Sequence, residues 1–274
     1  DLVLNGSIGN VLYWQKSTVA DFSTFQNLSV FTTTISASEI GPLNETTYFR
    51  AVLQSGNCGE SISEEATITI KSSTWNGMSW SNGNPDSVTT AIFEANYTAT
   101  ASINACNVIV KNGAIVTIPS GFTVTANGAV QVESGSLTFE NNANLIQTAE
   151  VQNSGNIVVK RNSSALKRLD YTLWSSPVGN QPLFSFSPQT TATRFYSYNS
   201  EENIYSAISI SPTTVFDRAK GYLIRMPNNH PATVPTIWNG SFTGVPHNGT
   251  ITVPLQNFGT GKRFNLVGNP YPSP

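Results

Sequence analysis

The chain has 274 residues, of which 39% are hydrophobic, so it is long enough for two or three domains with packed cores. Charged residues make up only 11% of it and the net charge is −2, whereas ordinary domains carry about 25% charged residues. This balance argues against nucleic-acid binding, which needs a basic patch that displaces counterions from phosphates.

Residues 1–72 are predicted to form an immunoglobulin-like β-sandwich. Trp14, in an early strand-like run, would be its core aromatic residue, packed between the sheets; an exposed ligand platform is the alternative, and we favour burial. The predicted strands are β-branched or aromatic runs that alternate with period two, separated by Asn, Gly, Ser and Pro. They are NVLYWQKS at 10–17, SVFTTTISASEI at 29–40, TTYFRAVLQSG at 46–56 and EEATITIK at 64–71.

Two tryptophans, Trp75 and Trp80, stand five residues apart in the turn-rich stretch TWNGMSWSNGNPD at 74–86. They are interpreted either as packing that covers the first rung of the following structure or as a sugar platform. We favour packing, because Trp supplies a large buried area. Asp86 is a single carboxylate and a poor calcium site, so no metal is predicted.

A seven- to eight-residue repeat runs from about residue 103 to 161. Gly113, Gly121, Gly128 and Gly135 recur at this spacing and Asn142 takes the next slot. Both residue types tolerate positive φ and can close tight turns. The repeat predicts a short parallel β-solenoid within a domain spanning 73–165; a meander of short hairpins is the alternative. The residues expected to be mostly buried are Val108, Val110, Val116, Ile118, Val124, Val130, Val132, Leu137, Phe139 and Leu145.

After residue 166 the short period is lost and longer apolar runs rich in aromatic residues appear. We predict a second β-sandwich at 166–274 that caps the open end of the solenoid, with YTLW at 171–174 at the junction. The basic run VKRNSSALKRLD at 159–170 is interpreted as a solvated loop. No helical periodicity is visible, so no helix longer than about three turns is expected. The predicted strands lie within 168–178, 192–200, 220–227, 234–245, 249–257 and 262–272.

Several of these segments, in this order, resemble a region of large surface and secreted proteins of gliding bacteria. They are TWNGMSWSNGNPD, VIVKNGAIVTIPSGFTVTANGAV, VKRNSSALKRLDYTLWSSPV, KGYLIRMPN and FNLVGNPYPSP. Those proteins are exported by the type IX secretion system, and residues 1–72 look like the immunoglobulin-like repeats that precede this region there. The resemblance covers nearly the whole chain. It implies a secreted, cell-surface location and a C-terminal sorting domain beyond Pro274 that engages the secretion machinery. It supplies no site residues.

The chain is interpreted as a piece of a longer protein, since it starts at Asp1 within an apolar run. Cys58 and Cys106 are assigned to different domains, and a disulfide needs Cα atoms within about 7 Å. We therefore predict that they are not bonded to each other. Cys58 would find its partner before residue 1. No apolar run approaches the roughly 20 residues of a membrane span, so none is expected.

No catalytic motif is apparent. His230 and His247 lie in loops beside Pro and are expected to be exposed, without a neighbouring nucleophile motif. Glu133, Glu140 and Glu150 fall on successive lines of the repeat, but a solvated face explains them better than a glycosidase pair. We predict a non-enzyme without a cofactor.

Three classes of function are considered: a structural stalk or adhesin, a carbohydrate-binding accessory region of a secreted polysaccharide-degrading enzyme, and an ice-binding-like face. The third needs Thr-x-Thr ranks, which the variable lines do not supply. The first is favoured, with a polysaccharide or another surface protein as partner. The candidate ligand-binding residues are Tyr196, Tyr198, Tyr205 and Trp238.

Overall fold

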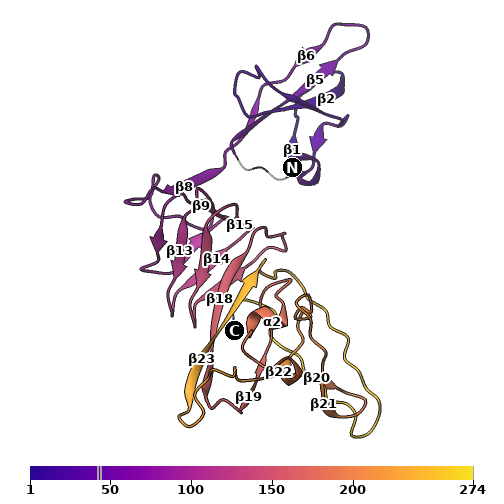
Figure 1. Ribbon diagram of the computed structural model, residues 1–274. Coiled ribbons are helices and arrows are strands. Elements are labelled where there is room, and N and C mark those ends of the chain that lie inside the picture. The colour runs from indigo at the N-terminus through magenta and orange to yellow at the C-terminus, as the bar shows by residue number, and fades with distance from the viewer. Residues whose placement is uncertain (42, 44, 274) are drawn as a thin grey trace. The chain divides into compact units, whose positions relative to one another are not determined.

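The computed structural model describes residues 1–41, 43 and 45–273, and the chain divides into two compact units, Asp1–Lys71 and Ser72–Pro274 (Figure 1). The predicted all-β class is confirmed, with 40% strand and 4% helix. As expected, the helices of the described residues are single turns: α1 (Ala37–Ile40), α2 (Leu183–Phe186) and the 3₁₀ turn η1 (Ala192–Arg194).

The first unit contains two antiparallel sheets. The larger has the order β3-β2-β5-β6, with β7 also paired to β5, and the smaller pairs β1 with β4. Their strands are β1 (Leu2–Val3), β2 (Asn10–Ser17), β3 (Gln26–Leu28), β4 (Thr34–Ile35), β5 (Thr47–Gln54), β6 (Ser61–Ile62) and β7 (Ala66–Ile68).

Trp14 lies in the core of this unit, where its side chain is 3% exposed. Its indole Nε1 donates a hydrogen bond to Thr32 O at 3.0 Å, so burial leaves no unpaired donor. The alternate residues Phe49, Ala51 and Leu53 of β5 pack in the same cluster. The expected burial of Trp14 is confirmed.

The run at 29–40 differs from the prediction. Only Thr34–Ile35 is strand, and α1 follows directly. Ser36 caps α1: its Oγ accepts from Glu39 N at 3.4 Å, while Glu39 Oε2 accepts from Ser36 N at 2.7 Å. This reciprocal capping box stabilises one helical turn, although the β-branched residues before it favour a strand.

The second unit begins with a parallel β-solenoid of about four turns (Figure 1). Its coils form three parallel faces: β9-β12-β15, β10-β13-β16-β18 and β11-β14-β17. Ile115 pairs with Ser136 and Thr123 with Asn144, each 21 positions later. One coil therefore consists of three of the short sequence lines, and the strands that stack are three lines apart. The strands are β8 (Lys71–Trp75), β9 (Thr89–Phe93), β10 (Tyr97–Thr98), β11 (Ile103–Ala105), β12 (Val108–Val110), β13 (Ile115–Ile118), β14 (Thr123–Ala126), β15 (Val130–Val132), β16 (Ser136–Phe139), β17 (Asn144–Gln147) and β18 (Ile157–Leu166).

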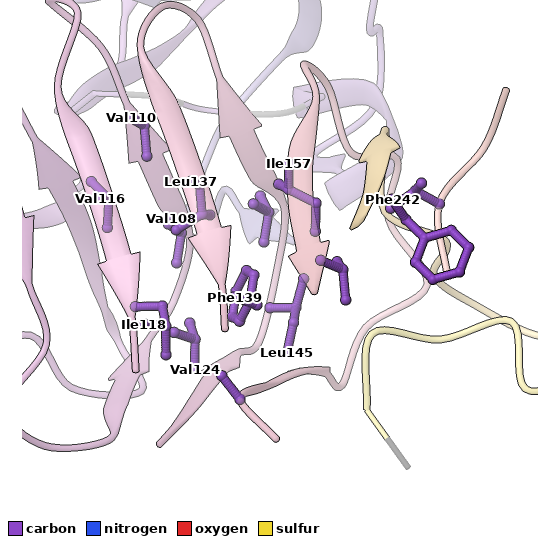
Figure 2. Close-up of a cluster of buried hydrophobic side chains, with 14 of the residues drawn as sticks. Val108, Val110, Val116, Ile118, Val124, Leu137, Phe139, Leu145, Ile157 and Phe242 are labelled. Carbon is purple, nitrogen blue, oxygen red and sulfur yellow. The ribbon is translucent and has the colours of Figure 1, made fainter. Parts of the chain in front are cut away.

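The interior of the solenoid is a stack of aliphatic and aromatic side chains. Figure 2 shows those of Val116, Ile118, Leu137 and Phe139 on neighbouring strands of one sheet, pointing to the same side. Of the ten residues expected to be buried, nine are at most 3% exposed, which confirms the register. Val132 is half-buried and packs against the core.

The turn residues act as predicted at most corners. Gly113, Gly121, Gly135 and Asn142 all have positive φ. Gly128 does not, and glycine serves there for another reason: a Cβ would collide with Asn107 Oδ1. That oxygen accepts a hydrogen bond from Ala129 N at 2.8 Å, so a side chain at 128 would disturb a contact between two coils.

The tryptophan pair packs on the first coil. Trp75 and Trp80 form an isolated bridge, and their rings contact Tyr97 with centroids 4.9 and 5.8 Å away. Trp80 also contacts Phe93 of β9 at 5.2 Å, edge to face. Trp75 Nε1 donates to Asn96 O at 3.0 Å. Both side chains are half-buried against the main core, which supports the packing interpretation.

The C-terminal part joins the solenoid through β18, which pairs antiparallel with β23 (Thr236–Gly244) over most of its length. The run at 159–170, predicted to be a solvated loop, therefore lies largely in a strand. A second, four-stranded antiparallel sheet has the order β19-β22-β20-β21. Its strands are β19 (Tyr171–Trp174), β20 (Phe195–Asn199), β21 (Ile204–Ala207) and β22 (Tyr222–Arg225).

Two predicted strands are wrong. Residues 249–257 and 262–272 contain no strand, only a bridge between Lys220 and Val267. The side chain of Asn265 instead holds this segment: its Oδ1 accepts from Gln256 N at 2.9 Å and its Nδ2 donates to Gln256 O at 2.9 Å. Pro272 O then accepts from Leu145 N of β17 at 3.3 Å. Pro274 lies outside the described residues.

Candidate functional site

The sheet β19-β22-β20-β21 has one face in the core and one face in solvent. Trp174, Phe195, Tyr222 and Ile224 are buried on the inner side. The alternate residues of the same strands must lie on the other side, because side chains alternate along a strand. This outer side carries three of the four candidate ligand-binding residues, and we call it the tyrosine face. Its members are Tyr171, Leu173, Tyr196, Tyr198, Tyr205, Ala207, Leu223 and Arg225.

Strand register brings the candidate tyrosines together. Tyr198 of β20 pairs directly with Tyr205 of β21, and their ring centroids are 5.3 Å apart at an interplanar angle of 69°. Tyr196 contacts Tyr171 of β19 at 5.8 Å and 69°. The rings within each pair meet edge to face rather than in one plane. The face therefore offers ring edges and hydroxyl groups, not a flat platform.

Two arginines accompany these tyrosines. Arg194 Nη1 donates to Tyr196 Oη at 3.2 Å, and this hydrogen bond lowers the pKa of Tyr196. Partial burial, followed by the contact with Tyr196, raises the pKa of Tyr171. Arg225 Nη2 donates to Asn228 Oδ1 at 2.6 Å and to Thr191 Oγ1 at 3.0 Å. Within the described residues no carboxylate forms a salt bridge with either guanidinium group.

Trp238 lies apart from the tyrosines, in β23. Its ring contacts Trp174 at 5.4 Å and Phe186 at 5.2 Å, both edge to face. It is half-buried and packed against the main core. The structure thus brings together Tyr196, Tyr198 and Tyr205 but places Trp238 in a packing cluster.

The histidines are less exposed than expected. His230 is 7% exposed, and its Nε2 lies 2.9 Å from Leu166 O and 3.1 Å from Thr236 O. His247 is half-buried, with Nδ1 3.0 Å from Pro270 O, and burial lowers its pKa. His230 thus contacts the main chain at the ends of β18 and β23, and His247 contacts the C-terminal segment.

The glutamates on the solenoid lines have separate surroundings. Glu140 forms a salt bridge with Lys160 at 2.7 Å. Glu150 accepts from Thr250 N at 2.8 Å. Glu133 is exposed. Glu140 and Glu150 thus interact with different parts of the fold.

Both cysteines are free: Cys58 is exposed and Cys106 is half-buried. Among the described residues, no three or more His, Cys, Asp or Glu side chains cluster in a way that could hold a metal ion. In the same part of the chain, no helix is long and apolar enough to cross a membrane.

Sequence reasoning missed Tyr171, Leu173, Arg194 and Arg225 as neighbours of the candidate tyrosines. The sequence predicts Tyr171 and Leu173 only as part of the junction, although the alternation in YTLW places them on the face of the strand opposite to that of Trp174. Arg194 stands only two positions before Tyr196, so this contact is local. Arg225 is a neighbour of the tyrosines through the non-local pairing of β20 with β22. No local pattern in the sequence reveals that pairing.

Comparisons with known proteins give two family matches. The family described as Domain of unknown function (DUF8693) matches residues 67–274, and the family described as Domain of unknown function (DUF8696) matches residues 1–72. No curated protein and no solved structure matches the chain.

Proposed function

The chain belongs to the DUF8693 family, which covers residues 67–274, and we propose that it is a non-catalytic segment of a large secreted cell-surface protein, acting as a structural stalk or adhesin. One observation carries this proposal: a single hydrogen-bonded sheet runs through the order β10-β13-β16-β18-β23. It links the solenoid coils to the C-terminal part without a flexible connection. Such continuity suits a segment that transmits force or holds a binding surface away from its anchor.

The side-chain packing supports the same proposal. One cluster of buried residues extends from Ala91 of the first coil through Phe139 and Ile157 to Phe242 of β23. Since the solenoid and the C-terminal part share this core, neither is expected to swivel against the other. Because the chain carries few charges, adhesion through its aromatic side chains and neutral hydrogen bonds would depend only weakly on salt.

For the finer architecture, we propose that residues 1–72 are an immunoglobulin-like module and that residues 166–274 form a β-sandwich that caps the solenoid. Trp14, buried among strands of antiparallel sheets, supports the first assignment. Hydrogen bonds from Asn153 Nδ2 to Pro246 O and from Asn248 Nδ2 to Ala149 O support the second. Export by the type IX secretion system stays part of the proposal.

Two measurements test this function: the location of the protein on cells and the attachment of cells that lack it. Antibodies raised against the chain should label intact, unpermeabilised cells of the source organism, and deletion of the gene should reduce attachment of those cells to surfaces. Labelling that requires permeabilisation would contradict the surface location. Hydrolysis of any glycan by the purified chain would overturn the non-catalytic assignment.

The second candidate is a carbohydrate-binding accessory region, and the tyrosine face favours it. Tyr205 is 42% exposed and Leu173 is 50% exposed, so a partly apolar, hydroxyl-bearing surface is open to a sugar. Glycan-array binding by the whole chain tests it, with Tyr196→Ala and Tyr198→Ala as probes. Tyr13→Ala, a half-buried tyrosine of the first unit, is the control. Binding that survives both changes would remove this site, and no binding would leave the structural role alone.

A further inference from the structure

A cavity of about 420 Å³ lies beside the last coils of the solenoid, and no residue of the tyrosine face lines it. Four separate segments build it: the corner between β16 and β17, strand β18, the loop after β19 and the C-terminal segment. Its volume is within the range of about 300–1,000 Å³ that is typical of small-ligand sites. Its polar lining includes Asn142, Asn144, Arg161, Asn269, Tyr271 and Ser273.

Arg161 is the cation of this cavity. Its side chain is half-buried, and its guanidinium donates to two carbonyls, Lys160 O through Nη1 and Pro272 O through Nη2, both at 2.8 Å. None of the salt bridges among the described residues includes Arg161. Burial lowers its pKa, because the charge has lost water without gaining an anionic partner. A guanidinium in this state binds a carboxylate strongly, because it still has N–H groups in its planar fork.

The neighbouring amides are suited to hydroxyl groups. No hydrogen bond joins the side-chain amide of Asn142 or Asn144 to another described residue, so both keep a donor and an acceptor for a ligand. Asn142 is an exposed corner residue with a φ of 62°. Asn269 is already occupied, since its Oδ1 accepts from Tyr271 N at 2.9 Å. The half-buried ring of Tyr271, held by a hydrogen bond from Oη to Gly249 O at 2.7 Å, supplies an apolar wall.

We propose that this cavity binds a carboxylate-bearing sugar residue, a uronate, of an acidic polysaccharide. Arg161 would hold the carboxylate, and Asn142 and Asn144 would contact the ring hydroxyls. A uronate carries one negative charge, which matches the single cation among the residues that line the cavity. A phosphate group, with its higher charge, would be less well neutralised. The site is independent of the tyrosine face, so either can fail without the other.

Calorimetric titration of the whole chain tests the site. Trigalacturonate is the probe, and galactotriose, a neutral trisaccharide without carboxylates, is the control ligand. Trigalacturonate should bind, and galactotriose should bind at least about tenfold more weakly, because a charge-assisted contact is lost. Arg161→Gln should weaken trigalacturonate binding by a similar factor. Arg194→Gln removes the same charge from beside the tyrosine face, and Tyr196→Ala alters that face; both should leave the affinity within about twofold.

A second measurement guards against unfolding of Arg161→Gln, whose parent side chain also tethers Pro272. In the wild-type chain, NMR titration with trigalacturonate should shift the side-chain amide signals of Asn142 and Asn144. The exposed Asn239 should stay unchanged. Equal binding of galactotriose, an unchanged affinity in folded Arg161→Gln, or no binding at all would overturn the proposal. Stronger binding of a sulfated trisaccharide or of a peptide with a free C-terminal carboxylate would also overturn it.

Discussion

The solenoid and the C-terminal segment at 251–273 have similar β-like compositions and opposite structures. In the solenoid, lines such as FTVTANG form strands whose alternate residues are buried, for example Val124 at 2% exposure. In the C-terminal segment, the runs TVPLQN and KRFNLV form no strand. Their large side chains remain exposed, including Leu255 at 68% and Phe264 at 64%.

The difference shows that alternation produces a strand only where a partner strand lies in register. Each middle line of the solenoid pairs with a line 21 or 22 positions away, as Val124 does with Leu145 and Val108 with Val130. The paired line supplies both the hydrogen-bonded ladder and the buried neighbour. The C-terminal runs have no such paired line. Pro254 lacks an N–H for a ladder, and the side chain of Asn265 takes the hydrogen bonds of Gln256.

The largest expected effect comes from a charge inside the solenoid. Val124→Asp should lower the free energy of unfolding by about 3–5 kcal/mol, because the carboxylate would be buried without a partner. Urea denaturation followed by circular dichroism measures it. Thr125→Asp, on the half-buried outer side of the same strand, is the matched control and should cost much less. An unchanged stability in Val124→Asp would show that the assigned register is wrong.

A smaller effect separates two glycines of the same repeat. At Gly135 φ is +92° and a Cβ would collide with Ala114 O of the preceding coil, so Gly135→Ala should cost about 3 kcal/mol. At Gly121 φ is +86° but nothing lies within 4 Å of a Cβ. Gly121→Ala should therefore cost only the backbone strain, about 1 kcal/mol. If urea denaturation gave the same loss of stability for both variants, the close contact of Gly135 with the preceding coil would contribute nothing beyond the strain of positive φ.

The sequence predicted the solenoid because its turns repeat, and it failed where they do not. The first coil, β9 to β11, lies before most of the repeat, and its span of 89–105 contains no glycine. The spacing of glycines could not reveal it. The helical turn α1 was missed although Ser36 and Glu39 carry a capping-box signature. There the local signal was present, and the β-branched run before it was given too much weight.

At the candidate site, the sequence supplied the tyrosines but not their surroundings. Tyr196, Tyr198 and Tyr205 belong to one hairpin, so their proximity follows from local pairing. Trp238 could have been recognised as a packing residue, because it shares the period-two side of β23 with the buried Phe242. Arg161 lines its cavity together with the C-terminal segment, where it contacts Pro272, 111 positions away. A sequence pattern does not encode a contact at that separation.

Alkaline pH should distinguish the C-terminal sheet from the solenoid. Tyr222 is 3% exposed, and burial, reinforced by its hydrogen bond to Asp217 Oδ2 at 2.9 Å, raises the pKa of its phenol. The folded state therefore favours the neutral form. Its stabilising contribution is complete below the unfolded pKa of about 10 and is lost as pH rises above that value.

Tyr222→Phe should consequently lower stability by about 1 kcal/mol at pH 7, through the lost hydrogen bond, but flatten the decline above pH 10. Thermal unfolding of both proteins between pH 7 and 12 measures this. Hydrogen exchange should show earlier alkaline opening of β22 than of β14, whose buried side chains Val124 and Ala126 are apolar. Parallel pH profiles for the two proteins would contradict the assignment.

The smallest effect is expected in the C-terminal segment itself. Leu255→Ala should change the free energy of unfolding by no more than about 0.5 kcal/mol, because a side chain that is 68% exposed loses little apolar contact. Leu137→Ala is the matched change in the solenoid. Leu137 is 1% exposed, and its truncation should cost about 2–5 kcal/mol through lost transfer energy and the cavity left behind. Urea denaturation of the two variants compares the regions directly. A cost for Leu255→Ala that approaches that of Leu137→Ala would mean that Leu255 is buried in solution, and the contrast between a laddered solenoid and an unladdered C-terminal segment would then be lost.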